Sequence, residues 1–216
     1  MKRIVSYILF IFCMWACANT PPSELPFFNS DELEPEWISP SDSKFTRIHK
    51  VKPFSFLNQD SVYITNKDFD GSIYITDFFF TTCPSICPKM TSNMLKLQTL
   101  YKNQDYINFL SHSVTPWIDT VAQLKRYAMD KGVISGKWHL VTGDENEIYK
   151  QARTSYFVEG KIGQHKELDD FVHTENFVLV DAKRRIRGIY NGTLERDIER
   201  LIEDIDTLLG TMSKHE

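Results

Sequence analysis

The chain has 216 residues, of which 42% are hydrophobic and 13% aromatic, enough to bury the core of one ordinary domain. Its formal net charge of −4 becomes −6 once Lys2 and Arg3 are set aside with a leader (−4 − 2), so there is no basic field to hold nucleic acid. The composition therefore disfavours a polyanion-binding protein, and no internal repeat argues against a single domain.

The N-terminal segment, residues 1–17, has the pattern of an export signal or membrane anchor. Residues 4–16 form an almost unbroken apolar stretch, shorter than the ~20 residues that a membrane span needs. Cys17 closes a loose lipobox and could become a lipidated N-terminus, whereas ordinary cleavage and an uncleaved anchor are the other two interpretations. All three send the domain out of the cytoplasm. We expect it to be tethered to the cell membrane on the extracytoplasmic (periplasmic) side.

Residues 18–44 are rich in prolines and acidic side chains. Such a composition buries little surface and predicts an extended tether. The residues concerned are Pro21, Pro22, Pro26, Asp31, Glu32, Glu34, Pro35, Glu36 and Pro40. The alternative is an N-terminal arm that packs on the domain through Phe27, Phe28 and Trp37.

A folded domain is predicted for residues 45–213, where short strands alternate with helices. In chain order we expect a hairpin of strands 54–57 and 62–65, a buried strand 73–80, a helix from Pro88, a strand 107–114, a helix 120–131 stopped by Gly132, a strand 138–141, a helix 144–155, strands 177–180 and 186–190, and a last helix 194–209. This order predicts an α/β domain with a mixed central sheet, flanking helices and an extra N-terminal β-hairpin.

Two cysteines stand out because Cys13 and Cys17 belong to the leader, which leaves only Cys83 and Cys87 in the folded part. Each precedes a proline, which disfavours helical backbone, so the segment should form a turn in which the two sulfurs converge. We place Cys87 at the N-cap of the following helix, where free amides and the macrodipole stabilise a thiolate. A disulfide that closes so short a loop removes little entropy from the unfolded chain and so adds little stability. The spacing therefore favours a reactive or metal-binding cysteine pair over a structural disulfide.

Several kinds of site compete for this pair. Inert buried thiols fit poorly with a proline-rich turn after a strand, and a structural zinc site usually needs four protein ligands. A redox pair or a low-coordination soft metal remains; copper combines two thiolates with an imidazole. His173 is the best third ligand, because it lies in a polar loop that leads into a predicted core strand, and His165 is the reserve on spacing alone. The other histidines are His49, His112, His139 and His215, and we expect each of them to be a surface residue or a hydrogen-bonded core residue.

The run Phe80-Thr81-Thr82-Cys83-Pro84-Ser85-Ile86-Cys87-Pro88 resembles the Cys-Pro-x-x-Cys-Pro signature of the Sco/SenC family, copper proteins related to thioredoxin. The segments 113–116, 124–128 and 138–143 agree, as does His173-Thr174 before 177–181, so the resemblance covers roughly residues 50–210. It implies a thioredoxin-like fold in which Cys83, Cys87 and His173 bind one copper ion, as Cu(I) or Cu(II).

The resemblance further implies a copper metallochaperone of the cell envelope, rather than an enzyme, that serves assembly of the binuclear copper centre of cytochrome c oxidase. Its partner would be the copper-accepting subunit of that oxidase. The alternative is a thiol:disulfide oxidoreductase that reduces the acceptor's cysteines through Cys83 and Cys87. A peroxidase of related fold is a third interpretation, supported by the fold class alone. One position departs from the family: many relatives carry Asp-Pro where this chain has Thr115-Pro116, and Thr115 cannot supply a charge.

Overall fold

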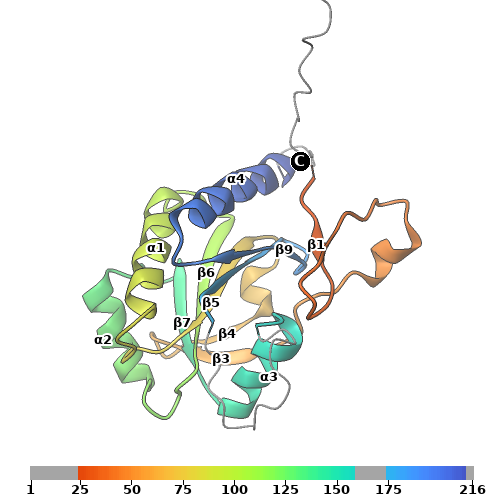
Figure 1. Cartoon of the computed structure of the whole chain (residues 1–216). Helices are drawn as coiled ribbons and strands as arrows, with labels where there is room; N and C mark the ends of the chain where they lie inside the picture. The colour runs from red at the N-terminus through yellow and green to blue at the C-terminus, as the bar shows by residue number, and fades with distance from the viewer. Residues whose placement is uncertain (1–23, 159–173, 213–216) are drawn as a thin grey trace, which may run out of the picture.

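The computed structural model describes residues 24–158 and 174–212 (Figure 1). Their centre is a seven-stranded mixed sheet with the strand order β4-β3-β7-β6-β5-β8-β9. Strands β5, β6 and β7 are parallel neighbours, whereas every other pairing in this sheet is antiparallel. The strands are β3 (Ser55–Asn58), β4 (Tyr63–Thr65), β5 (Ile73–Phe79), β6 (Ile107–Ser113), β7 (Trp138–Thr142), β8 (Asn176–Val180) and β9 (Ile186–Asn191). The predicted mixed sheet is confirmed.

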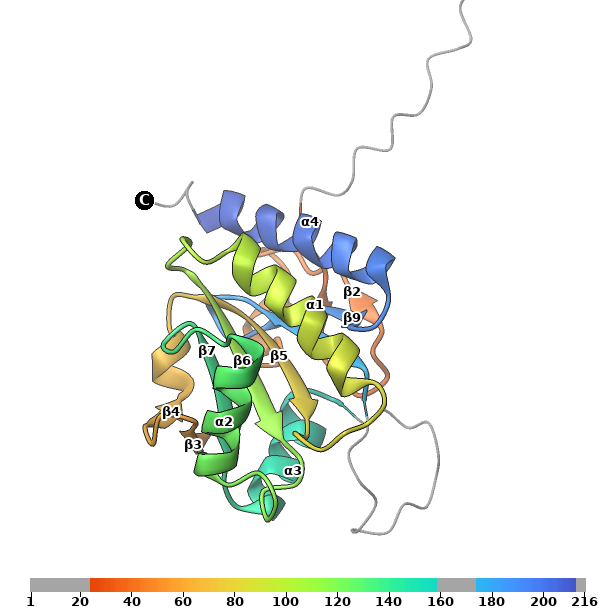
Figure 2. The same cartoon turned by 90° about the vertical axis from the view of Figure 1, so that its left-hand side faces the viewer.

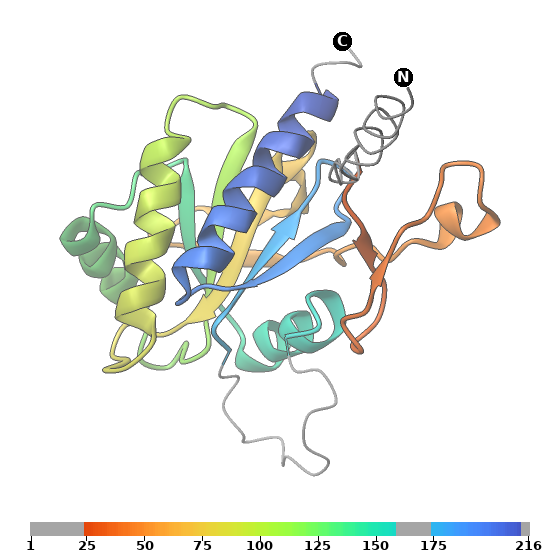
Figure 3. The same cartoon turned by 45° about the horizontal axis from the view of Figure 1, so that its top comes forward.

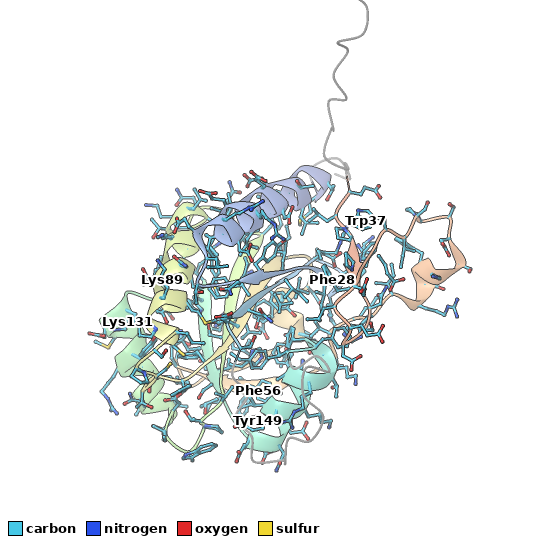
Figure 4. All side chains as sticks on the ribbon, in the orientation of Figure 1. Phe28, Trp37, Phe56, Lys89, Lys131 and Tyr149 are labelled. Atoms are coloured by element: carbon cyan, nitrogen blue, oxygen red, sulfur yellow. The ribbon has the colours of Figure 1, made fainter. Side chains whose placement is uncertain are left out.

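Helices cover both faces of the sheet, as Figures 1 and 2 show. Helices α1 (Cys87–Leu100), α2 (Val121–Lys131) and α4 (Glu195–Met212) pack against one face, and α3 (Glu145–Ser155) packs against the other. Phe56 of β3 and Tyr149 of α3, labelled in Figure 4, belong to the core on the α3 side. Two apolar layers therefore enclose the sheet, as a doubly covered parallel centre requires.

Local sequence explains where these elements begin and end. All seven residues of β5 are buried, in keeping with its run of aromatic and β-branched side chains. Helix α2 begins after Thr120, whose side chain accepts from the Gln123 amide, and it ends at Gly132, which adopts a left-handed φ of 80°. Asp144 caps α3 in the same way as Thr120 caps α2. The predicted boundaries coincide with those observed or differ from them by at most three residues.

The predicted hairpin forms between β3 and β4 and occupies one edge of the sheet. Asn58 closes its turn, because the side-chain oxygen accepts from the amides of Asp60 and Val62, both at 2.9 Å. A 3₁₀ helix (Asn66–Phe69) follows β4, and another (Ser43–Arg47) precedes β3.

The described residues ahead of the domain pack against it. Strands β1 (Phe27–Phe28) and β2 (Pro35–Glu36) pair with each other, and Phe27 is buried with Ile38 and Ile48. The Arg187 guanidinium of β9 lies 4.1 Å from the Phe27 ring centroid and donates to the Pro26 carbonyl. Figure 3 shows this arm beside β9. The sequence left open an extended tether or an arm packed on the domain. From Glu24 onward the segment is a packed arm, although Trp37 remains 60% exposed.

Candidate metal centre

The cysteine loop lies at the carboxyl edge of the parallel strands (Figure 2). Strand β5 pairs with β6 in register up to Phe79 and Ser113, so the loops that follow the two strands leave the sheet side by side. Cys83 lies in the loop between β5 and α1, and its amide donates to the Phe80 carbonyl at 3.3 Å. Cys87 is the first residue of α1. The end of the buried strand β5 and the start of α1 therefore position the two thiols.

The two thiols are free, lie close enough to change each other's pKa and are differently exposed. Partial burial opposes ionisation of Cys83, but hydrogen bonds from the Cys87 thiol and from the amides of Cys87, Ser85 and Ile86 outweigh it, so its pKa lies below the ordinary value. Burial, followed by the neighbouring Cys83 sulfur, raises the pKa of Cys87, which is 4% exposed. Cys83 is thus the thiol that ionises first.

This geometry corrects one detail of the sequence interpretation. The N-cap is Ile86 and not Cys87, because the helix begins at Cys87 and has proline in its first turn. The amides at the helix start therefore point toward the Cys83 sulfur, one turn upstream, and the macrodipole favours a thiolate there.

The sequence analysis did not identify a buried carboxyl that influences Cys87. Asp77 of β5 is 3% exposed and accepts from the Ser111 hydroxyl, which in turn accepts from Trp138 Nε1 at 2.9 Å. Burial raises the pKa of Asp77 to about 7, and its negative charge contributes to raising the pKa of Cys87. A single acidic residue inside an otherwise apolar strand was the signal that could have revealed it.

The loop after β6 also contacts the cysteine loop. Asp119 is fully buried, and its carboxylate accepts from the amide of Thr81, two residues before Cys83, at 3.1 Å. Thr115, the position where many relatives carry an acid, is 1% exposed, and its hydroxyl donates to Asp119 at 3.2 Å. The threonine therefore supplies a donor to this carboxylate, which an ionised acid could not do.

The described histidines have contacts away from the thiols. A ring nitrogen of His49 lies 2.9 Å from the Ser155 carbonyl oxygen, His139 Nδ1 lies 3.2 Å from Asn58 Nδ2, and His112 is buried at 0% exposure. Among residues 24–158 and 174–212, no group of three His, Cys, Asp or Glu side chains could hold a metal. Four residues singled out in the sequence lie outside the described residues: Cys17, His165, His173 and His215.

Comparison with known proteins shows the family to which the chain belongs. The SCO1/SenC family model matches residues 43–210. The chain belongs to the SCO1/SenC family. A sequence relative, the SCO1 protein homolog of Bacillus subtilis, is 30% identical over 159 residues, which are 73% of this chain and 81% of that protein. The thioredoxin-like fold expected from the resemblance is confirmed by solved Sco structures.

Three solved structures of the SCO1/SenC family illustrate what is known of its members. A SCO1/SenC family lipoprotein from Bacillus anthracis is 29% identical with a TM-score of 0.65, covering 74% of this chain and 95% of its own. BsSco, a member of the Sco family of cytochrome c oxidase assembly proteins in which a disulfide switch was identified, is 31% identical with a TM-score of 0.63, covering 74% and 94%. ScoI of Bradyrhizobium japonicum, solved with copper bound, is 28% identical with a TM-score of 0.58, covering 74% and 99%.

The described part of this SCO1/SenC chain contains no helix long and apolar enough to cross a membrane. The segment predicted to carry the signal or anchor, residues 1–17, lies outside that part.

Proposed function

We propose that this protein is a copper metallochaperone of the cell envelope. It binds one copper ion through the thiolates of Cys83 and Cys87 and the imidazole of His173, and it delivers the ion for assembly of the binuclear copper centre of cytochrome c oxidase. The copper-binding domain is residues 45–213, and Cys17 carries the membrane tether. Copper is cargo in this scheme, received and released by ligand exchange.

The observation that carries the proposal is the convergence of the two thiols. Cys83 and Cys87 lie close enough to change each other's pKa at the start of α1, where neighbouring amides favour a thiolate on Cys83. Thiolate is the ligand class that Cu(I) prefers, and imidazole suits both oxidation states. A relative, ScoI of Bradyrhizobium japonicum, has been solved with copper bound.

The choice of His173 is supported by the position of the strand that follows it. Strand β8 runs antiparallel to β5, with Val178 opposite Thr76, so the beginning of β8 lies toward the end of β5 from which the cysteine loop leaves. Thr174, the first described residue before β8, follows His173 directly in the chain. A ligand on the approach to β8 would thus come from the same edge of the sheet as the cysteines.

Membrane tethering is supported by two observations. The leader ends in a lipobox-like sequence at Cys17, and the Bacillus anthracis relative is described as a lipoprotein. Metabolic labelling with a fatty-acid analogue tests the lipid directly. Label retained after Cys17→Ser would contradict lipidation at this residue.

Copper analysis of the reduced full chain, purified in detergent, tests the metal site. Cys83→Ser and Cys87→Ser should abolish stoichiometric copper binding, and His173→Ala should lower the affinity by 10-fold or more, which is about 1.4 kcal/mol. His215→Ala is the matched histidine control and should bind as the wild type does. An unchanged affinity in His173→Ala would show that the site as drawn is wrong.

A second function, thiol:disulfide oxidoreduction, is favoured by the unequal environments of the thiols. Cys83, the more exposed thiol with the lower pKa, would attack an acceptor disulfide and release one acceptor thiolate; Cys87 would then attack the Cys83 sulfur and release the second. The acceptor gains two electrons, and this chain ends as the Cys83–Cys87 disulfide.

The two functions are distinguished by His173, because thiol exchange needs no imidazole. His173→Ala should lose copper affinity yet retain exchange with a disulfide substrate. The Cys87→Ser variant should accumulate the mixed disulfide with the acceptor. If it accumulates none above the level of Cys83→Ser, the oxidoreductase interpretation is excluded.

A further inference from the structure

The end of β5 and the start of α2 are joined by one buried carboxylate. Asp119 lies in the loop between β6 and α2 and is 0% exposed. Its oxygens accept from the Thr81 amide at 3.1 and 3.4 Å, from the Thr81 hydroxyl, from the Ser113 hydroxyl at 2.6 Å and from the Thr115 hydroxyl at 3.2 Å. Among the described residues it forms no salt bridge, so neutral donors alone stabilise the charge.

Thr81 is the residue of the cysteine loop on which this carboxylate acts. Both its amide and its hydroxyl donate to Asp119, and the hydroxyl also accepts from Gln123 Nε2 of α2 at 3.1 Å. A hydroxyl that donates in one direction and accepts in another has a fixed rotamer. The turn that carries Cys83 is therefore held from outside its own loop, by a residue 38 positions away.

The strand pairing shows why the contact forms at this place. The Val114 amide donates to the Phe79 carbonyl at 2.9 Å, so the β5–β6 ladder continues to the last residue of β5. Beyond it the chain leaves the sheet, and the Thr81 amide has no strand partner; Asp119 supplies its acceptor instead. The next backbone bond runs from the Cys83 amide to the Phe80 carbonyl. Asp119 thus fixes the residue from which the Cys83 turn starts.

We propose that Asp119 is a positioning residue for the cysteine pair, acting through Thr81. It stabilises the arrangement in which the two reduced thiols face each other beside the helix start, which is the copper-receptive arrangement if the proposed function holds. Outer contacts of this kind typically change metal affinity 10- to 100-fold when they are removed. Because the carboxylate stabilises the dithiol arrangement, its loss should also shift the thiol–disulfide equilibrium toward the disulfide.

The first test is the redox equilibrium of the full chain with glutathione, which needs no copper. Asp119→Asn keeps the shape but replaces one acceptor oxygen with an NH₂ group, so either Thr81 or Ser113 loses its acceptor. We expect the equilibrium constant for disulfide formation to rise about 10-fold, which is ~30 mV for this two-electron couple. The Cu(I) affinity measured by competition should fall by at least about 10-fold.

Two further variants keep the test decisive if Asp119→Asn fails to fold. Thr81→Val removes the hydroxyl but keeps the side-chain shape, and Thr81→Ser restores the hydroxyl. Thr81→Val should reproduce the shift in potential and Thr81→Ser should reverse it. If Thr81→Val has the wild-type potential, the inference is wrong whatever becomes of Asp119→Asn.

A matched control separates positioning from general loosening. Asp181, in the turn between β8 and β9, is another buried carboxylate that accepts several hydrogen bonds, among them that from the Lys183 amide at 2.9 Å. Asp181→Asn should lower the melting temperature without moving the potential. An equal shift in potential for Asp181→Asn would overturn the inference. Failure of wild-type protein to bind copper would instead overturn the proposed function and leave the redox result standing.

Discussion

Acidification should destabilise this protein through one buried histidine. His112 of β6 is 0% exposed, and burial lowers its pKa from the ordinary 6.5 to about 3. Its Nδ1 lies 3.2 Å from the Thr76 hydroxyl, and its Nε2 has no hydrogen-bond partner among the described residues. The surrounding rings are Phe54, Phe56, Phe78 and Tyr156. A protonated imidazole would have no counter-charge in this aromatic setting.

The sign and size of the effect follow from the two pKa values. The unfolded chain takes up the proton near pH 6.5 and the folded chain only near pH 3, so stability is lost as the pH falls through that interval. At about pH 4.5, some two units below the unfolded pKa, the loss relative to about pH 7.5 is about 3 kcal/mol. That is a large fraction of the stability of an ordinary domain.

Urea unfolding at several pH values, for the wild type and for His112→Phe, measures this contribution. Phenylalanine suits the aromatic surroundings and cannot be protonated, so the difference between the two unfolding free energies isolates His112 from the other titrating groups. The difference should change by about 3 kcal/mol in favour of the variant between about pH 7.5 and pH 4.5. A constant difference over that range would refute the argument that His112 is held neutral.

Three further results are expected. Iodoacetamide should modify Cys83 at least ~10-fold faster than Cys87 in the reduced protein, because Cys83 is more exposed and has the lower pKa; peptide mapping that finds Cys87 modified first would contradict this. Since burial raises the pKa of Asp77 to about 7, the contribution of Asp77 to stability is lost as the pH rises from about 4 toward that value. Asp77→Asn should therefore gain up to about 4 kcal/mol relative to the wild type between pH 4 and pH 8 in urea titrations, and parallel curves would contradict it. Arg187→Ala should release the arm at Phe27, cost about 3 kcal/mol and speed proteolysis there, whereas unchanged cleavage would mean that the arm is held by other contacts.

Local patterns predicted most of the fold because each rests on neighbours in the chain. The run at 73–80 became a fully buried strand, and Thr120 and Gly132 bounded a helix as a cap and a left-handed stop should. The turn residues between β3 and β4 likewise specified the hairpin. Each of these elements could be predicted from residues that are close together in the sequence.

The buried polar groups around the thiols could not be predicted, because their partners are distant in the chain. Asp77 and Ser111 are 34 positions apart, and Thr81 and Asp119 are 38 apart. The packing of the arm could not be predicted for the same reason, since the Pro26 carbonyl accepts from Arg187, 161 positions later. Only the register of β5 with β6, and the place of β9 at the sheet edge, bring these groups together.

The packed arm limits how far the domain can stand from a bilayer. Only residues 18–23 separate Cys17 from Glu24, where the arm begins its contacts, and seven such steps span at most about 25 Å. Arg187, which donates to the Leu25 and Pro26 carbonyls, lies near the start of β9, next to Ile186. Ile186 pairs with Val180, which in turn pairs with Tyr74 near the start of β5, whereas the cysteine loop follows the end of β5. With a lipid on Cys17, the tether would therefore join the domain at the edge of the sheet opposite the thiols. A copper acceptor in the same membrane would then have to meet the cysteines at the edge of the sheet away from the tether.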